Sequence, residues 1–169
     1  DPFGLLDYPF ALFSRCELAA IEDVRWGSWR GLDVKRFDLS CSTPSGGERT
    51  WFACAIGPAG PSIVPLLVEA EAMAALLAEP AMGKVDVGSR GPGRPYVVRC
   101  DDPAFARAIV GPPMLGWLGG LEEPWGFEMR GSLAVVYGRP SSGVEDTLER
   151  LQGFAELAQS ALSQPPVIE

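Results

Sequence analysis

Short apolar runs separated by glycine, proline and polar turns fill the first sixty residues of the chain. Two of these runs flank Arg30-Gly31, a two-residue loop in which the glycine tolerates the positive φ of a tight hairpin. A third run, TWFACAI, is apolar on both faces, as expected for a central strand. The pattern predicts three antiparallel strands over 16–29, 32–41 and 50–56.

Two short helices are predicted in the middle of the chain. Residues 70–79 are rich in alanine and leucine and are followed by a proline, which ends a helix. Asp102 can accept hydrogen bonds from the free N–H groups of a second helix. Pro103 fits the first turn of that helix, where it loses no hydrogen bond, and Gly111 ends it.

Strands are predicted on both sides of the second helix. Residues 96–100 place alternate apolar side chains on one face. Residues 125–129 and 132–137 flank a second Arg-Gly pair, Arg130-Gly131. We expect these two runs to form a hairpin with the same turn chemistry as the first.

The last element is the most regular one. Ser142 and Glu145 have the spacing of a capping box, in which each side chain binds the other residue's free backbone N–H. Apolar residues then recur at helical spacing, which predicts an amphipathic helix over 144–162. Hairpins with helices between them indicate an α+β fold, with a mainly antiparallel sheet and helices packed on one face.

Aromatic residues near the N-terminus and near the first hairpin turn are the candidate interaction surface. Residues 1–14 form an apolar segment, interrupted by Pro9, whose large side chains are spaced as on one helical face. This strip either lies on the core or faces a membrane or a partner, and two tryptophans near the turn are either core residues or binding anchors. The candidate residues are Phe3, Leu6, Phe10, Phe13, Trp26 and Trp29.

Composition limits the class of protein. A length of 169 residues with 47% hydrophobic residues suits one globular domain spanning 1–169. The formal net charge of −8 disfavours nucleic acid as a partner, because the chain repels phosphate. The nearest approach to a basic patch is Arg90, Arg94 and Arg99, which we interpret as solvated arginines around a loop.

The chain lacks the residues that several classes of enzyme require. The chain has no histidine, which excludes Ser-His-Asp and Cys-His nucleophiles and HExxH hydrolases. Gly83-Lys84 is followed by Val85, so there is no Walker A motif. No catalytic, metal-binding or cofactor-binding residue is assigned, and no cofactor is expected.

The four cysteines do not form a CxxC pair. Cys16, Cys41, Cys54 and Cys100 lie in apolar, strand-like runs, where a free thiol behaves as a small hydrophobe. A chain of this length does not need a disulfide to fold, so we expect buried free thiols. One disulfide is the alternative.

Two acidic residues are the best candidates for acid–base chemistry. Asp38 follows Phe37 in a predicted strand and needs a partner if it is buried, for which Arg36 and Arg25 are candidates. Glu128 lies in the second hairpin. A carboxylate enzyme would require the two acids to converge in a cleft with raised pKa values, and a structural ion pair is the simpler interpretation of Asp38.

Four segments resemble a family of actinobacterial proteins that has no assigned activity. They are PFALFSR near the start, VRWGSWRGLDVKRFD at 24–38, RPYVVRCDDPAFARAIVGPPMLGWL at 94–118 and GFEMRGSLAVVYGR at 126–139. The resemblance covers about half of the chain and is best at the tryptophan-arginine-glycine hairpin and the Asp-Asp-Pro helix start. It implies an N-terminal membrane segment before Asp1 followed by one soluble domain, and it implies no catalytic residue.

Three hypotheses follow for the function. The first is a non-catalytic, membrane-tethered domain that binds a protein partner or the membrane surface and lies in the cytoplasm. The second is a small-molecule or lipid-binding domain with a cavity between the sheet and the C-terminal helix. The third is the carboxylate enzyme, and the oligomeric state is left open by the sequence.

Overall fold

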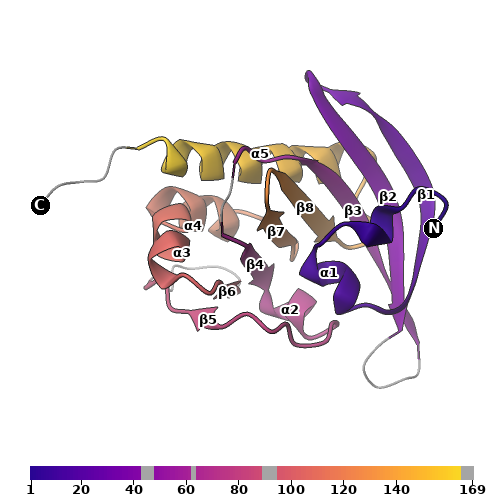
Figure 1. Ribbon diagram of the computed structural model, residues 1–169, viewed down its shortest axis with the longest axis horizontal. Helices are drawn as coiled ribbons and strands as arrows, with labels where there is room; N and C mark the ends of the chain where they lie inside the picture. The colour runs from indigo at the N-terminus through magenta and orange to yellow at the C-terminus, as the bar shows by residue number, and fades with distance from the viewer. Residues whose placement is uncertain (43–47, 62–63, 89–94, 165–169) are drawn as a thin grey trace, which may run out of the picture.

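The computed structural model describes residues 1–42, 48–61, 64–88 and 95–164. In this part of the chain the strands form one antiparallel sheet of eight, in the order β1-β2-β3-β8-β7-β4-β6-β5 (Figure 1). The α+β class predicted from the sequence is confirmed.

The first hairpin forms one edge of the sheet. β1 (Glu17–Trp29) and β2 (Leu32–Ser42) are joined by Arg30 and Gly31, with φ values of 49° and 81°. Positive φ at both central positions is the geometry of a tight hairpin turn, as the sequence predicted. β3 (Arg49–Pro58) pairs with β2 and continues the sheet toward its centre.

The second hairpin lies at the centre of the sheet. β7 (Gly126–Arg130) and β8 (Leu133–Gly138) pair antiparallel, and β8 also pairs with β3. The turn is one residue later than predicted, because Arg130 pairs with Leu133 and the loop is Gly131-Ser132. Only the glycine of this loop has a positive φ, of 62°, so the two hairpins use different turns.

Three shorter strands complete the sheet. β4 (Leu66–Ala70) pairs with β7, and β6 (Tyr96–Arg99) pairs with β4. β5 (Lys84–Val85) forms the far edge. All five residues of β4 are buried, which is expected for a strand that is covered on both faces.

Three helices cover one face of the sheet, which we call the helical face. They are α3 (Pro103–Ile109), α4 (Pro112–Gly119) and α5 (Val144–Leu162). The Asp102 carboxylate accepts a hydrogen bond of 3.1 Å from the Phe105 N–H, so the predicted helix start is confirmed. The range of α5 is also confirmed, but its N-cap is Gly143 with no side-chain hydrogen bond, so the capping box does not form.

The sheet and α5 pack directly against each other. The rings of Phe127 and Phe154 stack with their centroids 4.8 Å apart. A Cβ added to Gly57 would lie 2.9 Å from a Leu151 methyl carbon, so sheet and helix are in close contact there. Sheet and helix thus touch at these points, on the face where the sequence predicts a cavity.

The opposite face carries a second apolar cluster under shorter helices. These are η1 (Leu5–Asp7), α1 (Ala11–Ser14) and α2 (Glu71–Ala74), the last much shorter than the helix expected over 70–79. Figure 1 shows α1 and α2 on the side of the sheet away from α5. The sheet is thus covered on both faces, and the helices predicted on one face are joined by small ones on the other. The largest buried side chains of this cluster are Leu5, Leu12, Phe37, Leu39, Phe52, Met73 and Tyr137.

One disulfide is present where free thiols were expected. Cys16 and Cys41 are bonded, while Cys54 and Cys100 are free and buried. Free thiols were expected because a chain of this length does not need a disulfide to fold. The fold, however, places the Cα atoms of Cys16 and Cys41 5.0 Å apart, which suits a disulfide. Burial raises the pKa of both free thiols, so they are poor nucleophiles.

Candidate functional site

Residues 1–16, called here the N-terminal segment, are fixed to the sheet by three separate interactions. The first is a buried carboxylate under α1. Glu128 on β7 accepts hydrogen bonds from the N–H groups of Ala11 (2.7 Å) and Leu12 (3.2 Å). Its side chain is fully buried, and this desolvation raises its pKa even though the two N–H groups and Arg130 favour the charged form. The carboxylate therefore satisfies the free N–H groups at the start of α1.

The second interaction is a buried ion pair at the end of α1. Arg15 donates two hydrogen bonds of 2.8 Å to the Glu69 carboxylate and one of 2.6 Å to the carbonyl oxygen of Ala78. Both charged side chains are 3% exposed. The hydroxyl of Tyr137 donates to the same carboxylate. Burial, and next the Glu69 charge, raises the pKa of Tyr137 well above its usual value, so the phenol stays protonated.

The third interaction is the disulfide. Cys16 directly follows Arg15, and its bond to Cys41 ties the end of the N-terminal segment to β2. Three chemically different contacts thus hold a segment of only two short helices in one position.

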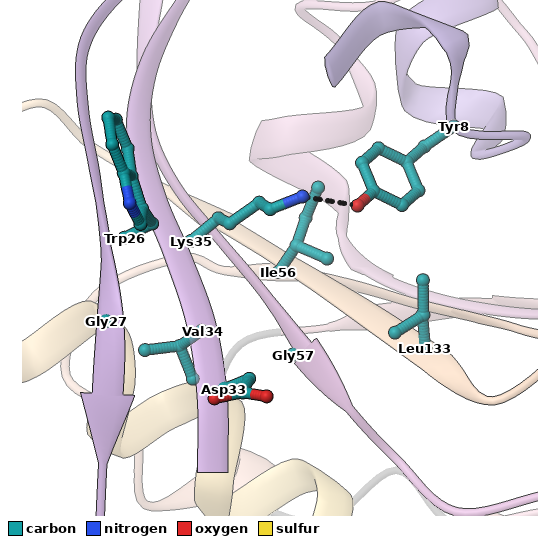
Figure 2. Close-up of a pocket in the computed structure, with 9 residues that line it drawn as sticks. All are labelled: Tyr8, Trp26, Gly27, Asp33, Val34, Lys35, Ile56, Gly57 and Leu133. Atoms are coloured by element: carbon teal, nitrogen blue, oxygen red, sulfur yellow. Dashed lines mark hydrogen bonds between the residues drawn. The ribbon is translucent and has the colours of Figure 1, made fainter. Parts of the chain in front are cut away.

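A groove lies between this segment and the sheet. It has a volume of about 430 Å³ and is open to solvent on one side. Trp26, Lys35 and Ile56 form one cross-strand row of its floor, since Trp26 pairs with Lys35 and Lys35 with Ile56. Tyr8 lies opposite them, as Figure 2 shows. The complete lining is Tyr8, Trp26, Gly27, Asp33, Val34, Lys35, Ile56, Gly57 and Leu133.

Lys35 is the cation of this groove. Its side chain reaches from β2 toward Tyr8, and its ammonium donates a hydrogen bond of 2.6 Å to the Tyr8 hydroxyl (Figure 2). The ammonium also lies 5.0 Å from the centre of the Tyr8 ring. Among the described residues, Lys35 forms no ion pair with a carboxylate. The groove thus contains a positive charge that no direct ion pair of the described residues holds, with the Asp33 carboxylate as a second charge in the same lining.

Two exposed aromatic side chains lie at this groove. Trp26 is 66% exposed and Phe3 is 49% exposed, and their ring centroids are 5.3 Å apart. Exposed aromatic pairs beside a concave surface are typical of binding sites, because they lose water on contact with a ligand.

The six candidate interaction residues are therefore divided between surface and core. Phe3 and Trp26 are exposed and touch each other, whereas Phe10 and Phe13 are buried in the cluster under the N-terminal segment. Leu6 is partly buried against the same cluster.

Trp29, the sixth candidate, is partly buried against the cluster on the helical face. Its ring lies under the Arg30 guanidinium at 5.0 Å. Trp29 is therefore separated from Trp26 by the sheet.

The two acids considered for catalysis do not converge. Glu128 pairs with Val135 and Val135 with Ile56, which places Glu128 on the same face as Lys35. Asp38 is three residues further along β2 than Lys35, so its side chain points to the other face. There it forms an ion pair of 2.8 Å with Arg36, one of the two partners expected from the sequence.

The other candidate chemistries find no site in the described part of the chain. No three His, Cys, Asp or Glu side chains group there as metal ligands. Arg90 and Arg94 lie outside the described residues, and Arg99 forms an ion pair of 3.0 Å with Glu79. No helix in residues 1–42, 48–61, 64–88 and 95–164 combines the length and the hydropathy needed to cross a bilayer.

Two residues of the groove were missed by the sequence analysis. Tyr8 belongs to the apolar segment of residues 1–14 and Lys35 to the predicted strand 32–41, and neither was singled out. A signal for Lys35 existed, since it is one of only two lysines and lies in a strand that continues into the apolar core. The contact with Tyr8 joins residues 27 positions apart, which no local pattern shows.

Comparison with known proteins gives a fold and no family. No protein-family model matches the sequence, and no curated protein matches it. The structure is similar to that of a mycobacterial protein. That protein is the trehalose monomycolate transport factor A, TtfA, whose crystal structure superimposes with a TM-score of 0.64 at 15% sequence identity. The match covers 93% of this chain and 81% of the other, and at this identity it shows a shared fold.

Proposed function

We propose that this chain is a non-catalytic binding domain that takes an amphipathic, lipid-like molecule into the groove between its N-terminal segment and the sheet. The observation that carries the proposal is the exposed Trp26–Phe3 pair beside a groove of about 430 Å³. That volume falls within the range of about 300–1,000 Å³ typical of small-molecule sites. The transport factor that shares the fold is named for a mycolic lipid of trehalose, which supports a lipid-related role.

The lipid-binding hypothesis is therefore kept, but the proposed site is the groove beside the N-terminal segment and not the space between the sheet and α5. The groove lies on the face of the sheet opposite α5, and no residue of α5 lines it. The N-terminal segment takes the place that the C-terminal helix has in the sequence-based hypothesis, because α5 already packs closely against the sheet.

The experiment is a binding measurement with a neutral single-chain amphiphile, n-dodecyl maltoside below its micelle concentration, by calorimetry. We expect the wild type to bind and Trp26→Ala to bind at least tenfold more weakly, because truncating a tryptophan anchor costs about 2 kcal/mol or more. Trp51→Ala is the matched control. Trp51 is also exposed, but it pairs with Ser40 and so points to the other face.

Two outcomes of this experiment would contradict the proposal. One is a wild type that does not bind the amphiphile. The other is an equal loss of affinity in Trp26→Ala and Trp51→Ala, which would place the binding surface elsewhere.

A second candidate function is contact with a protein partner or a membrane surface through Phe3 and Trp26. It is favoured by the exposure of both rings side by side, since exposed apolar patches mark protein and membrane interaction sites. Sedimentation with vesicles of neutral phosphatidylcholine measures it. If the wild type sediments with the vesicles and Trp26→Ala does not, the result supports contact with a membrane. If the wild type does not sediment with them, only a soluble ligand or a protein partner remains as a candidate.

Tethering to a membrane and the compartment remain predictions, the first supported by the family resemblance. The Cys16–Cys41 disulfide argues against the cytoplasm, because disulfides persist in oxidising compartments. The test is to quench cells in acid, alkylate the chain under denaturing conditions, and count the modified cysteines by mass spectrometry. Two modified cysteines indicate an exported domain, and four indicate the cytoplasmic location expected from the sequence.

A further inference from the structure

We infer that the groove selects amphiphiles with an anionic head, such as a carboxylate or a phosphate monoester, and that Lys35 binds this head. The inference rests on the proposed function, since it names the ligand class of the same site. It goes beyond that function because a neutral head, such as a sugar, would not need the charge.

The chemistry around the Lys35 ammonium favours an anionic ligand. Its hydrogen-bond partner is the hydroxyl of Tyr8, and no ion pair holds it among the described residues. An ammonium has three N–H donors, so donors remain for a ligand. The Tyr8 hydroxyl, which accepts from Lys35, has its own proton free to donate to an anion held at the same place.

Lys35 is also half-buried. Its neighbours in the floor of the groove are Trp26 and Ile56, and neither carries a charge. Charge-assisted hydrogen bonds are stronger away from bulk water, so an anion gains more here than at an exposed lysine. Trp26 and Phe3 then supply apolar surface for the chain of the ligand.

A second charge in the groove sets the orientation of the ligand. Asp33 also lines the groove and is exposed, two residues before Lys35 on the same face of β2. Two residues of a strand span about 7 Å. An anionic head is repelled at the Asp33 end and attracted at the Lys35 end, so the two charges fix its position near Tyr8.

The net charge of the chain favours a single molecule over an anionic bilayer as the ligand. The formal net charge of the chain is −8, which repels an extended anionic surface. A single head group that reaches Lys35 inside the groove meets the local positive charge instead. Anionic phosphatidylglycerol vesicles are therefore not expected to bind.

The test compares three probes with the same alkyl chain: decanoate, decanol and decyltrimethylammonium. We expect the wild type to bind decanoate about tenfold more tightly than decanol, and the cation most weakly. Lys35→Met should bind decanoate and decanol with the same affinity, and Lys35→Arg should restore the preference. Lys84→Met is the control, since Lys84 is the other lysine of the chain and lies on the far edge strand β5.

The variants separate this inference from the proposed function. Trp26→Ala should weaken the binding of decanoate and of decanol equally, and Asp33→Asn should strengthen the binding of decanoate alone. If the wild type binds decanoate and decanol equally, or if Lys35→Met keeps the preference, the head-group inference is wrong while the lipid-binding proposal stands. If no probe binds, the proposed function itself fails.

Discussion

The ion pair between Arg15 and Glu69 gives the sharpest test of how the N-terminal segment is held. Arg15→Met keeps most of the length of the side chain but removes the three hydrogen bonds to Glu69 and Ala78. The Glu69 carboxylate then remains buried with only the Tyr137 hydroxyl as partner. Removing one member of a buried pair costs about 3–5 kcal/mol, because the remaining charge is left uncompensated.

The loss is measured by urea unfolding at pH 7, followed by tryptophan fluorescence. With a urea dependence of about 2 kcal/mol/M, the midpoint should fall by roughly 2 M. The double variant Arg15→Met with Glu69→Gln removes the uncompensated charge, and the amide oxygen can still accept from Tyr137. We therefore expect the double variant to be more stable than Arg15→Met by about 1–3 kcal/mol.

The same substitution at an exposed pair is the control. Arg25 and Asp23 form an ion pair of 3.3 Å with 63% and 47% of their side chains exposed. Arg25→Met should cost less than about 1 kcal/mol, as is usual for surface pairs. The reasoning is refuted if the two arginine variants lose the same stability, or if the double variant is no more stable than Arg15→Met.

The other two contacts of the N-terminal segment give further predictions. Burial raises the pKa of Glu128 above its ordinary 4.5, so the folded state resists ionisation and the wild type loses stability as pH rises through the folded pKa. Glu128→Gln does not titrate, and its stability relative to the wild type should rise from pH 4 to pH 7 in urea unfolding; a falling difference would contradict this. Replacing Cys16 and Cys41 together by alanine should cost about 3.5 kcal/mol, from the entropy of a loop with a sequence separation of 25. Dithiothreitol should lower the urea midpoint of the wild type to that of the variant, and an unchanged midpoint would show that the bond does not stabilise the fold.

These contacts matter for the groove because Tyr8 is one of its walls. Glu128, Arg15 and Cys16 all lie outside the groove lining, yet they fix the segment that carries Tyr8. A ligand that enters the groove therefore meets a preformed wall, which lowers the entropy lost on binding.

Local patterns in the sequence predicted most secondary structure. Arg30-Gly31 marked the first hairpin because few residues other than glycine accept the φ that such a turn requires. Asp102 marked the start of α3 because its carboxylate can accept a hydrogen bond from the free N–H groups of the first turn. Where two local signals competed, the prediction was less exact. The N-cap of α5 is Gly143 and not Ser142, and the turn of the second hairpin lies one residue later than predicted.

The candidate site depended on contacts that are distant along the chain. Lys35 and Tyr8 are 27 residues apart, and Glu128 and Ala11 are 117 apart. The pattern of residues 1–14 predicted an apolar strip but not which aromatic side chains would leave the surface. Phe10 and Phe13 lie in the core beside α1, whose first N–H groups bind Glu128, whereas Phe3 lies at the surface against Trp26.

The sequence by itself determined the α+β class, the first hairpin turn and the absence of histidine chemistry, since these depend on residue type and short-range spacing. Tertiary structure decided the disulfide, the two buried carboxylates and the groove. Each of these requires side chains from separate strands and helices to meet, and only the packing of the whole sheet fixes which ones do.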